Sequence, residues 1–356
     1  SITAKGVNHM TLLVQTERIL ANFRILQKQA GGTPLIPTLE ANAYGLGDVA
    51  VAQLLAGAGI KTVAVSRLEE AVRIAENVRG LDILLLTPYA GEEDITAILK
   101  NDIIAAVGSN DSAVLISSLS RKLRCRARVQ LCFDFGMGRF GYMPQDVVKA
   151  AQTIHHLENV ELYGVFTALP AKKMKEAAAL QQVKDFQRVL TAIEREGLRY
   201  GIAHMADSSQ AAQYKEMRLG AVRAGADLFG RGPQKERHGL KKVGRAVSEI
   251  CDLKWMAAGS TVGEDGGYKL RRATRLAVVP AGLADGVFTD GQMKGWLFFR
   301  PKLTCEINGR KAPVVGRVGL TSLTADVTDL DCAPGDIVSF EADPVGISAF
   351  TRRDYV

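Results

Sequence analysis

The stretch from Pro37 to Gly47 carries the residues best placed for chemistry. A short apolar run, Leu35–Ile36, leads into a polar, glycine-punctuated turn, and helical spacing follows from Asp48. Strand, turn and helix in this order predict a βα unit. Side chains at the carboxyl end of such a strand face the ligand crevice, so Glu40 and Tyr44 are candidates for catalysis or binding.

The elements that must position these residues repeat along the first two thirds of the chain. Strand-like runs alternate with helical spacing at a period of ~25 residues, which is typical of parallel strands joined by crossover helices. We expect strands at 62–65, 83–86, 103–107, 127–133, 162–167, 201–205 and 221–226, with helices at 17–30, 48–58, 67–77 and 92–100. The count favours a closed (β/α)₈ barrel, and the pattern alone leaves an open doubly wound sheet as the alternative.

The last third of the chain has a different pattern. Short β-rich runs at 275–279, 296–299, 313–315 and 337–340 are separated by Gly, Asp and Asn turns. We therefore expect an α/β protein with an N-terminal (β/α)₈ TIM-type barrel, residues 1–240, and a C-terminal mostly-β domain, residues 241–356. An opening strand at 11–14 is expected to belong to either domain.

Composition narrows the class of protein. The chain has 356 residues, 47% hydrophobic and 23% charged, as in ordinary globular enzymes. Its net charge of +7 is scattered, so we expect no nucleic-acid partner. Five separated cysteines without a C-x-x-C motif indicate neither a metal site nor disulfides. Without a long apolar run or a secretory pattern at its start, the chain is expected to be cytoplasmic and not bound to a membrane.

The run Ala-Asn-Ala-Tyr-Gly-Leu-Gly at 41–47 resembles the signature of the alanine racemases. These are fold-type III pyridoxal phosphate (PLP) enzymes, in which a preceding lysine forms a Schiff base with PLP. This chain has Glu40 at the lysine position and Leu46 at that of a histidine, and a carboxylate cannot form an imine with an aldehyde. The resemblance covers nearly the whole chain and implies a barrel, a C-terminal β domain and a homodimer with shared active sites.

Further blocks carry the resemblance through the barrel. The block at 132–141 implies that Arg139 binds the substrate carboxylate, with Cys132 in place of a supporting lysine. From the residues alone, an ion pair between Arg139 and Asp134 is the alternative. In the block at 164–168, Ala168 replaces a histidine that stacks on the cofactor ring.

Two later blocks imply an anion site. The one at 205–210 places Ser208 where the family binds the cofactor phosphate and puts Asp207 in place of an asparagine. The one at 222–230 places Arg223 beside the pyridine nitrogen, with backbone N–H groups of Gly225 and Ala226 on the phosphate. The added charge of Asp207 is expected to weaken phosphate binding.

The C-terminal domain adds a second acid by the same resemblance. Glu264 stands at the position of the family's catalytic tyrosine, which reaches into the partner's active site. Leu320 falls in the substrate-contacting block, and Tyr355 is a candidate for a late phosphate-binding tyrosine. Two acids thus replace two bases, and paired carboxylates can supply one proton donor and one acceptor.

The pattern predicts an enzyme that acts by acid–base catalysis on a small amine- or amino-acid-derived substrate. Proton transfer, cyclisation or condensation, and a lyase step are all compatible with two carboxylates. We expect no cofactor, or PLP bound only noncovalently. One alternative is a non-catalytic protein that binds a small metabolite. Another is an amino-acid racemase that uses PLP, with Lys172 or Lys173 as its reserve lysine.

Overall fold

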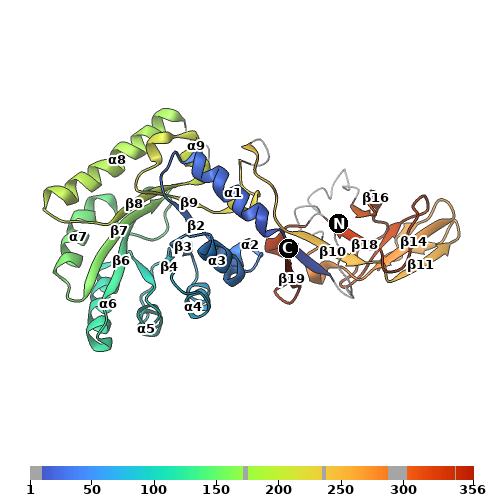
Figure 1. Ribbon diagram of the computed structural model, residues 1–356, viewed down its shortest axis with the longest axis horizontal. Helices are drawn as coiled ribbons and strands as arrows, with labels where there is room; N and C mark the ends of the chain where they lie inside the picture. The colour runs from blue at the N-terminus through green and yellow to red at the C-terminus, as the bar shows by residue number, and fades with distance from the viewer. Residues whose placement is uncertain (1–9, 171–174, 235–237, 288–302, 341) are drawn as a thin grey trace. The chain divides into compact units, whose positions relative to one another are not determined.

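Two compact units make up the chain (Figure 1). The computed structural model describes residues 10–170, 175–234, 238–287, 303–340 and 342–356. One unit comprises residues 17–43 and 47–242, and the other comprises 44–46, 243–356 and the start of the chain up to residue 16. We call them the barrel unit and the β unit.

Eight parallel strands form the barrel unit. They are β2 (Leu35–Pro37), β3 (Thr62–Val65), β4 (Asp82–Leu85), β5 (Ile104–Val107), β6 (Ala127–Asp134), β7 (Val160–Ala168), β8 (Ile202–Asp207) and β9 (Ala221–Ala224). Their order in the sheet is β2-β9-β8-β7-β6-β5-β4-β3. The sheet nearly closes on itself, because β2 and β3 meet through a bridge between Thr38 and Ala64 and a hydrogen bond from Leu39 N–H to Ala64 O (2.7 Å).

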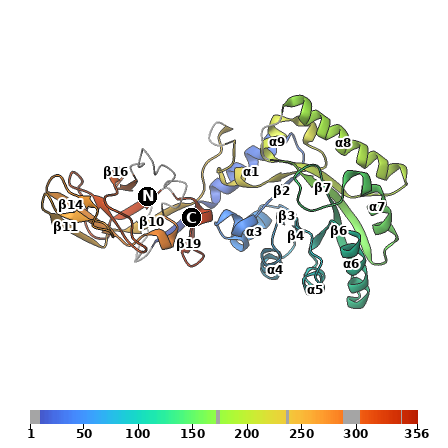
Figure 2. The same cartoon turned by 180° about the vertical axis from the view of Figure 1, so that it is seen from behind.

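Helices cover the outside of this sheet, as Figure 2 shows from behind. They are α1 (Thr16–Gln29), α3 (Asp48–Gly57), α4 (Leu68–Asn77), α5 (Glu92–Lys100), α6 (Asn110–Leu123), α7 (Val147–His156), α8 (Glu176–Arg195) and the short α9 (Ser208–Gln213). In α4 the buried residues Leu68, Ala71 and Ile74 recur every three residues, so one face packs inward. Side chains from five strands fill the barrel interior: Ile36, Ala64, Leu84, Ile104 and Ala221.

Strands dominate the β unit. A six-stranded sheet has the order β16-β15-β18-β10-β1-β19, and a three-stranded sheet the order β11-β14-β17. The bounds are β1 (Thr11–Val14), β10 (Arg245–Glu249), β11 (Asp252–Met256), β12 (Thr261–Val262), β13 (Tyr268–Lys269), β14 (Thr274–Val279), β15 (Thr304–Ile307), β16 (Arg310–Pro313), β17 (Leu323–Asp326), β18 (Ile337–Phe340) and β19 (Arg352–Tyr355). Strand β1 therefore pairs with β10 and β19 rather than with barrel strands.

The predicted fold class is confirmed, with two local differences. The strand expected at 313–315 is instead β16, Arg310–Pro313, which starts earlier because Asn308 and Gly309, both at positive φ, make a two-residue turn after β15. Strand β8 continues to Asp207, past the end expected at residue 205. The strand expected at 296–299 lies outside the described residues.

Candidate active site

A cavity of about 310 Å³ lies at the carboxyl ends of the barrel strands. Glu40, Arg139, Asp207 and Arg223 all line it, so four of the residues expected to act together do meet there. Sequence reasoning missed Ser66, which also lines the cavity and donates a hydrogen bond through its hydroxyl to Glu40 Oε2 (2.9 Å). This bond orients the carboxylate at the barrel mouth.

Glu40 is followed by four residues in the left-handed region. Ala41, Asn42, Ala43 and Tyr44 have φ values of 52°, 59°, 52° and 54°. A left-handed turn costs roughly 1–2 kcal/mol per non-glycine residue, so surrounding contacts must hold it. Such strain concentrates at functional sites, and here it directly follows the candidate base.

Hydrogen bonds hold this left-handed turn in place. The N–H of Asn42 donates to Glu70 Oε1 (2.9 Å), and the Asn42 side-chain oxygen accepts from Asp48 N–H (3.0 Å). Burial raises the pKa of Glu70, although the N–H of Asn42 acts in the opposite direction. Arg73 pairs with Asp48 at the start of α3, through Nε and Oδ1 at 3.1 Å among other contacts. Glu70 could not be singled out from the sequence, because one acid among the charged residues of a helix is typical of a solvated face.

Arg223 reaches the cavity from inside the barrel. Its guanidinium donates to His204 Nδ1 (2.6 Å) and to the carbonyls of Thr167 (2.9 Å) and Met205 (3.2 Å). These partners are neutral, and burial lowers the pKa of Arg223 to about 10. A buried cation with neutral partners favours an anionic ligand at its open side.

His204 connects Arg223 to Gln130 of strand β6 through two hydrogen bonds. Because arginine only donates, His204 Nδ1 must accept, so Nε2 carries the hydrogen and donates to Gln130 Oε1 (2.9 Å). Burial and the charge of Arg223 lower the pKa of His204 well below its usual value, in agreement with a neutral ring. Phe166 stacks on this ring with centroids 5.2 Å apart. Sequence reasoning passed over His204 as part of a strand.

The Arg139 loop is organised by a carboxylate. Asp134 accepts hydrogen bonds from the N–H groups of Gly136 (2.8 Å), Met137 (2.7 Å) and Arg139 (2.8 Å). Burial acts to raise the pKa of Asp134, but these N–H groups lower it overall. Asp134 thus contacts Arg139 through the backbone N–H of Arg139. The guanidinium of Arg139 lies over the Phe140 ring, 5.0 Å from the ring centroid. Both Arg139 and Phe140 line the cavity.

Cys132 forms part of the cavity wall. It is buried, and burial raises the pKa of its thiol to about 12, although Arg223 and Arg139 act in the opposite direction. The thiol is therefore neutral near pH 7 and cannot replace the charge of the lysine that the resemblance expected there.

Ser208 and Asp207 occupy the start of α9 but have different surroundings. Asp207 accepts from Gln210 N–H (2.8 Å), and burial raises its pKa, with nearby Asp227 adding to the effect. The Ser208 hydroxyl donates to Asp227 Oδ2 (2.8 Å) rather than lining the cavity. Asp227, two residues after Gly225 in the block at 222–230, was missed from the sequence.

Gly225 and Ala226 begin a short turn of 3₁₀ helix, η3 (Ala226–Phe229). The carbonyl of Gly225 accepts from Leu228 N–H (2.9 Å), and that of Ala226 accepts from Arg231 N–H (2.9 Å). Their proposed contacts with a phosphate stay a prediction.

Three predicted site residues belong to the β unit. The side chain of Glu264 is exposed and packs against Gly319, Leu320 is 69% exposed, and Tyr44 is partly buried. The pairing of Glu264 with the Glu40 of a partner chain stays a prediction. Tyr355 donates through its hydroxyl to Leu46 O (2.9 Å).

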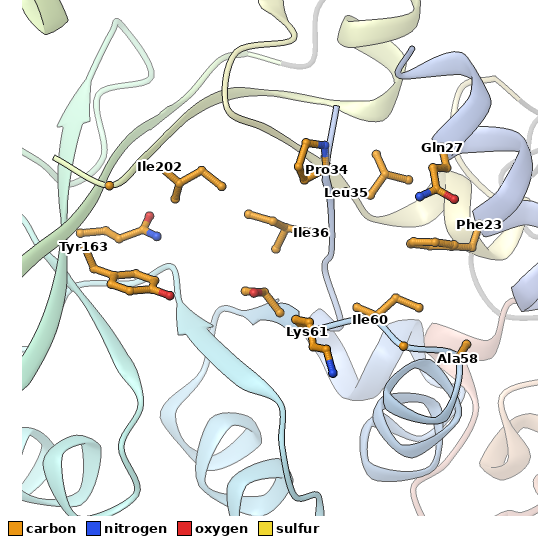
Figure 3. Close-up of a pocket in the computed structure, with 14 residues that line it drawn as sticks. Phe23, Gln27, Pro34, Leu35, Ile36, Ala58, Ile60, Lys61, Tyr163 and Ile202 are labelled. Atoms are coloured by element: carbon orange, nitrogen blue, oxygen red, sulfur yellow. The ribbon is translucent and has the colours of Figure 1, made fainter. Parts of the chain in front are cut away.

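A larger cavity, of about 600 Å³, opens at the amino ends of the barrel strands (Figure 3). Phe23 and Gln27 of α1 border it on one side, and Tyr163 lies on the other. Its lining is mostly apolar, with Lys61 as a charged member. Barrel enzymes carry their chemistry at the carboxyl ends of the strands, so the smaller cavity is the candidate active site.

None of the described helices combines the length and the apolar character needed to span a membrane. No group of three His, Cys, Asp or Glu side chains in the described parts of the chain is arranged to hold a metal ion.

Comparison with known proteins accounts for both units. The chain matches the family description "Alanine racemase, N-terminal domain" over residues 14–233 and "Alanine racemase, C-terminal domain" over residues 243–349. It is 30% identical over 312 residues to an alanine racemase of Desulfovibrio desulfuricans, which covers 86% of this chain and 82% of that protein. An alanine racemase of Halothermothrix orenii is 28% identical over 323 residues, covering 89% and 83%.

Solved structures give the same picture. An alanine racemase of Clostridium difficile 630 has a TM-score of 0.88 at 25% identity, covering 100% of this chain and 97% of that chain. The alanine racemase of Bartonella henselae, with a TM-score of 0.78 at 24% identity and coverage of 98% and 99%, contains covalently bound pyridoxal phosphate. Together these relatives contradict the expectation of a protein without a cofactor, which rested mainly on the residue at position 40. By the family matches across both units, the chain belongs to the alanine racemase family.

Proposed function

We propose that this chain is a PLP-dependent enzyme that moves the proton on the amine-bearing carbon of a small amino acid. The observation that carries the proposal is the position of Glu40, a carboxylate oriented by Ser66 in a cavity that also holds the cations Arg139 and Arg223. Relatives named alanine racemase support an isomerase acting on an amino acid.

The cofactor part of this proposal replaces the expectation made from the sequence. Arg223 supports it, because its buried charge has neutral hydrogen-bond partners and opens onto the cavity. When bound, PLP withdraws electrons from the carbon that loses its proton. The residues matched to phosphate binding are Ser208, Gly225 and Ala226, and Arg223 would face the ring nitrogen.

The catalytic residues are also proposals. We assign Glu40 to the lysine position and Glu264 to the tyrosine position of the family signature. Residue 40 cannot be the point of covalent attachment, because a carboxylate does not form an imine. It can accept a proton when ionised and return it when neutral, which is what exchange at a carbon centre requires.

The remaining residues position the substrate. The Arg139 guanidinium offers a planar fork of donors that suits the substrate carboxylate. Ser66 restricts the orientation of Glu40 through its hydrogen bond. His204, held neutral, keeps Arg223 directed toward the cavity. Each of these residues acts by binding or orientation and moves no proton from the substrate.

We further propose a homodimer in which the partner's Glu264 completes the site. Support comes from the match of Glu264 to a position that the family uses in trans. The two acids would then approach the substrate from the two chains, one taking a proton and one supplying it.

The proposal is tested with purified protein and PLP. Absorbance in the near ultraviolet and violet reports PLP binding, and borohydride reduction followed by mass spectrometry locates any attached lysine. Exchange of the Cα proton of D- and L-alanine in D₂O, followed by NMR, reports the reaction.

Glu40→Gln is expected to slow this exchange by ~10²–10⁴-fold, because general acid–base groups contribute that much. The matched control is Glu69→Gln, which removes an exposed carboxylate from nearby α4 and is expected to have no effect. Unchanged exchange in Glu40→Gln would contradict the role of Glu40. PLP binding without any exchange in the wild-type chain would favour a non-catalytic binding protein.

A further inference from the structure

The buried carboxylate of Asp227 accepts hydrogen bonds from two hydroxyl groups next to the proposed phosphate site. Asp227 Oδ2 accepts from the hydroxyls of Ser208 (2.8 Å) and Ser209 (2.7 Å) and from Gln234 Nε2 (3.0 Å). Asp227 Oδ1 accepts from Gln234 N–H (3.2 Å). With 3% exposure, this anion is almost fully removed from water. We call these four residues the Asp227 cluster.

The backbone closes tightly around this carboxylate. A Cβ atom at Gly232 would lie 1.9 Å from Asp227 Oδ1, so only glycine fits there. Ser208 itself is 7% exposed, and Gln234 is equally buried. The carboxylate is therefore a fixed part of the fold and leaves little room for a second anion among the same donors.

The donors of the Asp227 cluster are those that a phosphate group would need. Hydroxyls and N–H groups bind carboxylate and phosphate oxygens alike, and a donor that serves one anion is withdrawn from the other. Asp207, at the start of the same short helix, adds a second acid close by, whose buried carboxyl is influenced by Asp227. A phosphate entering here meets occupied hydroxyls and neighbouring negative charge.

We infer that Asp227 competes with the cofactor phosphate for Ser208 and Ser209, and that it thereby sets how strongly this chain prefers PLP over unphosphorylated pyridoxal. The inference rests on the proposed binding of PLP in this cavity. Asp227 acts as a specificity-determining residue, since it binds the two serine hydroxyls and does not itself line the cavity.

Two substitutions separate the charge of Asp227 from its hydrogen bonds. Asp227→Asn keeps the shape and removes the charge, whereas Asp227→Ala also frees both serine hydroxyls. The matched control is Asp111→Asn, an exposed acid at the start of α6. Dissociation constants for PLP and for pyridoxal are measured by equilibrium dialysis, and thermal melting checks that each variant is folded.

Asp227→Asn is expected to bind PLP about 10-fold more tightly, since a charge-assisted hydrogen bond is worth roughly that factor. Pyridoxal affinity is expected to stay within about twofold, because the ring contacts are unchanged. Equal tightening for both ligands, or none for PLP, in folded variants would overturn the inference while leaving the proposed cofactor intact.

PLP binding by the wild type and by the Asp227 variants distinguishes this inference from the proposed function. If the wild-type chain binds no PLP but a folded Asp227 variant does, the inference is supported and the proposed function fails for the natural chain. If neither the wild type nor any folded variant binds PLP, both ideas are overturned. If all proteins bind PLP and only the Asp227 variants tighten, both are supported.

Discussion

The imidazole of His204 is the residue on which the direction of Arg223 depends. It is wholly buried, accepts from the guanidinium at Nδ1 and donates to Gln130 from Nε2. Protonation of the ring would place a hydrogen on Nδ1, where it would face the donor N–H groups of Arg223. The folded chain therefore requires the neutral ring, which agrees with its lowered pKa.

A pH dependence of stability follows from this requirement. Above about pH 6.5, where histidine in an unfolded chain titrates, both states hold a neutral ring and His204 does not change the free energy of unfolding. Below that pH the unfolded chain binds a proton that the folded chain refuses. The free energy of unfolding then falls with pH by at most about 1.4 kcal/mol per unit, until the lowered folded-state pKa is reached.

The measurement is urea unfolding between pH 7.5 and 5 of the wild type, His204→Gln and the control His155→Gln. His155 is exposed, so its loss is expected to leave the slope unchanged. His204→Gln is expected to be less stable at pH 7.5 and to lose less stability on acidification. A variant slope equal to that of the wild type would argue against a neutral buried imidazole.

From the sequence, position at a strand end pointed to Glu40 and Tyr44, and the family resemblance added Arg139, Asp207 and Arg223. Glu40, Arg139, Asp207 and Arg223 were expected at the barrel mouth, and all line the cavity. Ser208 does not, because Asp227 holds its hydroxyl. That contact depends on two loops meeting in space, which no pattern along the chain reveals.

Among the elements, the left-handed turn after Glu40 bears most directly on the site. Its four residues lack the freedom of glycine, and Ala43 is completely buried. The turn is held by Asn42, whose backbone and side chain bind Glu70 and Asp48. These contacts offset the conformational cost and fix the position of Glu40.

Relieving the backbone cost at an exposed position of this turn is expected to be harmless. Ala41→Gly recovers roughly 1–2 kcal/mol of left-handed strain and loses about 0.5–1 kcal/mol through the greater freedom of the unfolded chain. The variant should be as stable as the wild type or slightly more stable. Ala75→Gly, in the right-handed helix α4, should instead lose about 0.5–1 kcal/mol. Denaturant unfolding of both variants decides, and an equal loss in the two would refute the strain at Ala41.

Element positions were predictable where the apolar pattern is strong. The strands at 62–65 and 337–340 and the helix at 92–100 match the observed bounds. The left-handed turn was not foreseen, because Ala-Asn-Ala-Tyr contains no glycine to mark positive φ. Its conformation is imposed by tertiary hydrogen bonds rather than by local preference.

For the whole molecule, the proposal is that two chains build one site. Glu40 belongs to the barrel unit and Glu264 to the β unit. The proposed homodimer pairs each Glu40 with the partner's Glu264. Mixing two differently substituted proteins tests this arrangement.

Mixing Glu40→Gln protein with Glu264→Gln protein should restore activity. Because a twofold dimer has two equivalent sites, each hybrid then carries one site with both substitutions and one with neither. Up to half of the native activity is therefore expected from a hybrid dimer. Cα-proton exchange is the readout, and mass spectrometry of the native complex confirms that subunits have exchanged. Confirmed hybrids that remain as inactive as their parents would exclude a shared site.

The sequence predicted two units of different class because strand–helix alternation gives way to short strands. The predicted barrel is confirmed, and among the described residues β2 and β3 are joined through a bridge and one further hydrogen bond. Counting strands does not reveal how well the last pair is joined.

The hydrogen-bonded line from Gln130 through His204 to Arg223 has a consequence for anyone who varies this scaffold. Gln130 lines the larger cavity, at the amino ends of the strands, and Arg223 lines the smaller cavity, at the carboxyl ends. Two hydrogen bonds therefore connect opposite ends of the barrel. Substitutions confined to the larger cavity would therefore also change the hydrogen bonding of His204 and the electrostatic environment of Arg223 in the smaller cavity. In this chain the amino-terminal end of the barrel cannot be redesigned independently of the candidate active site.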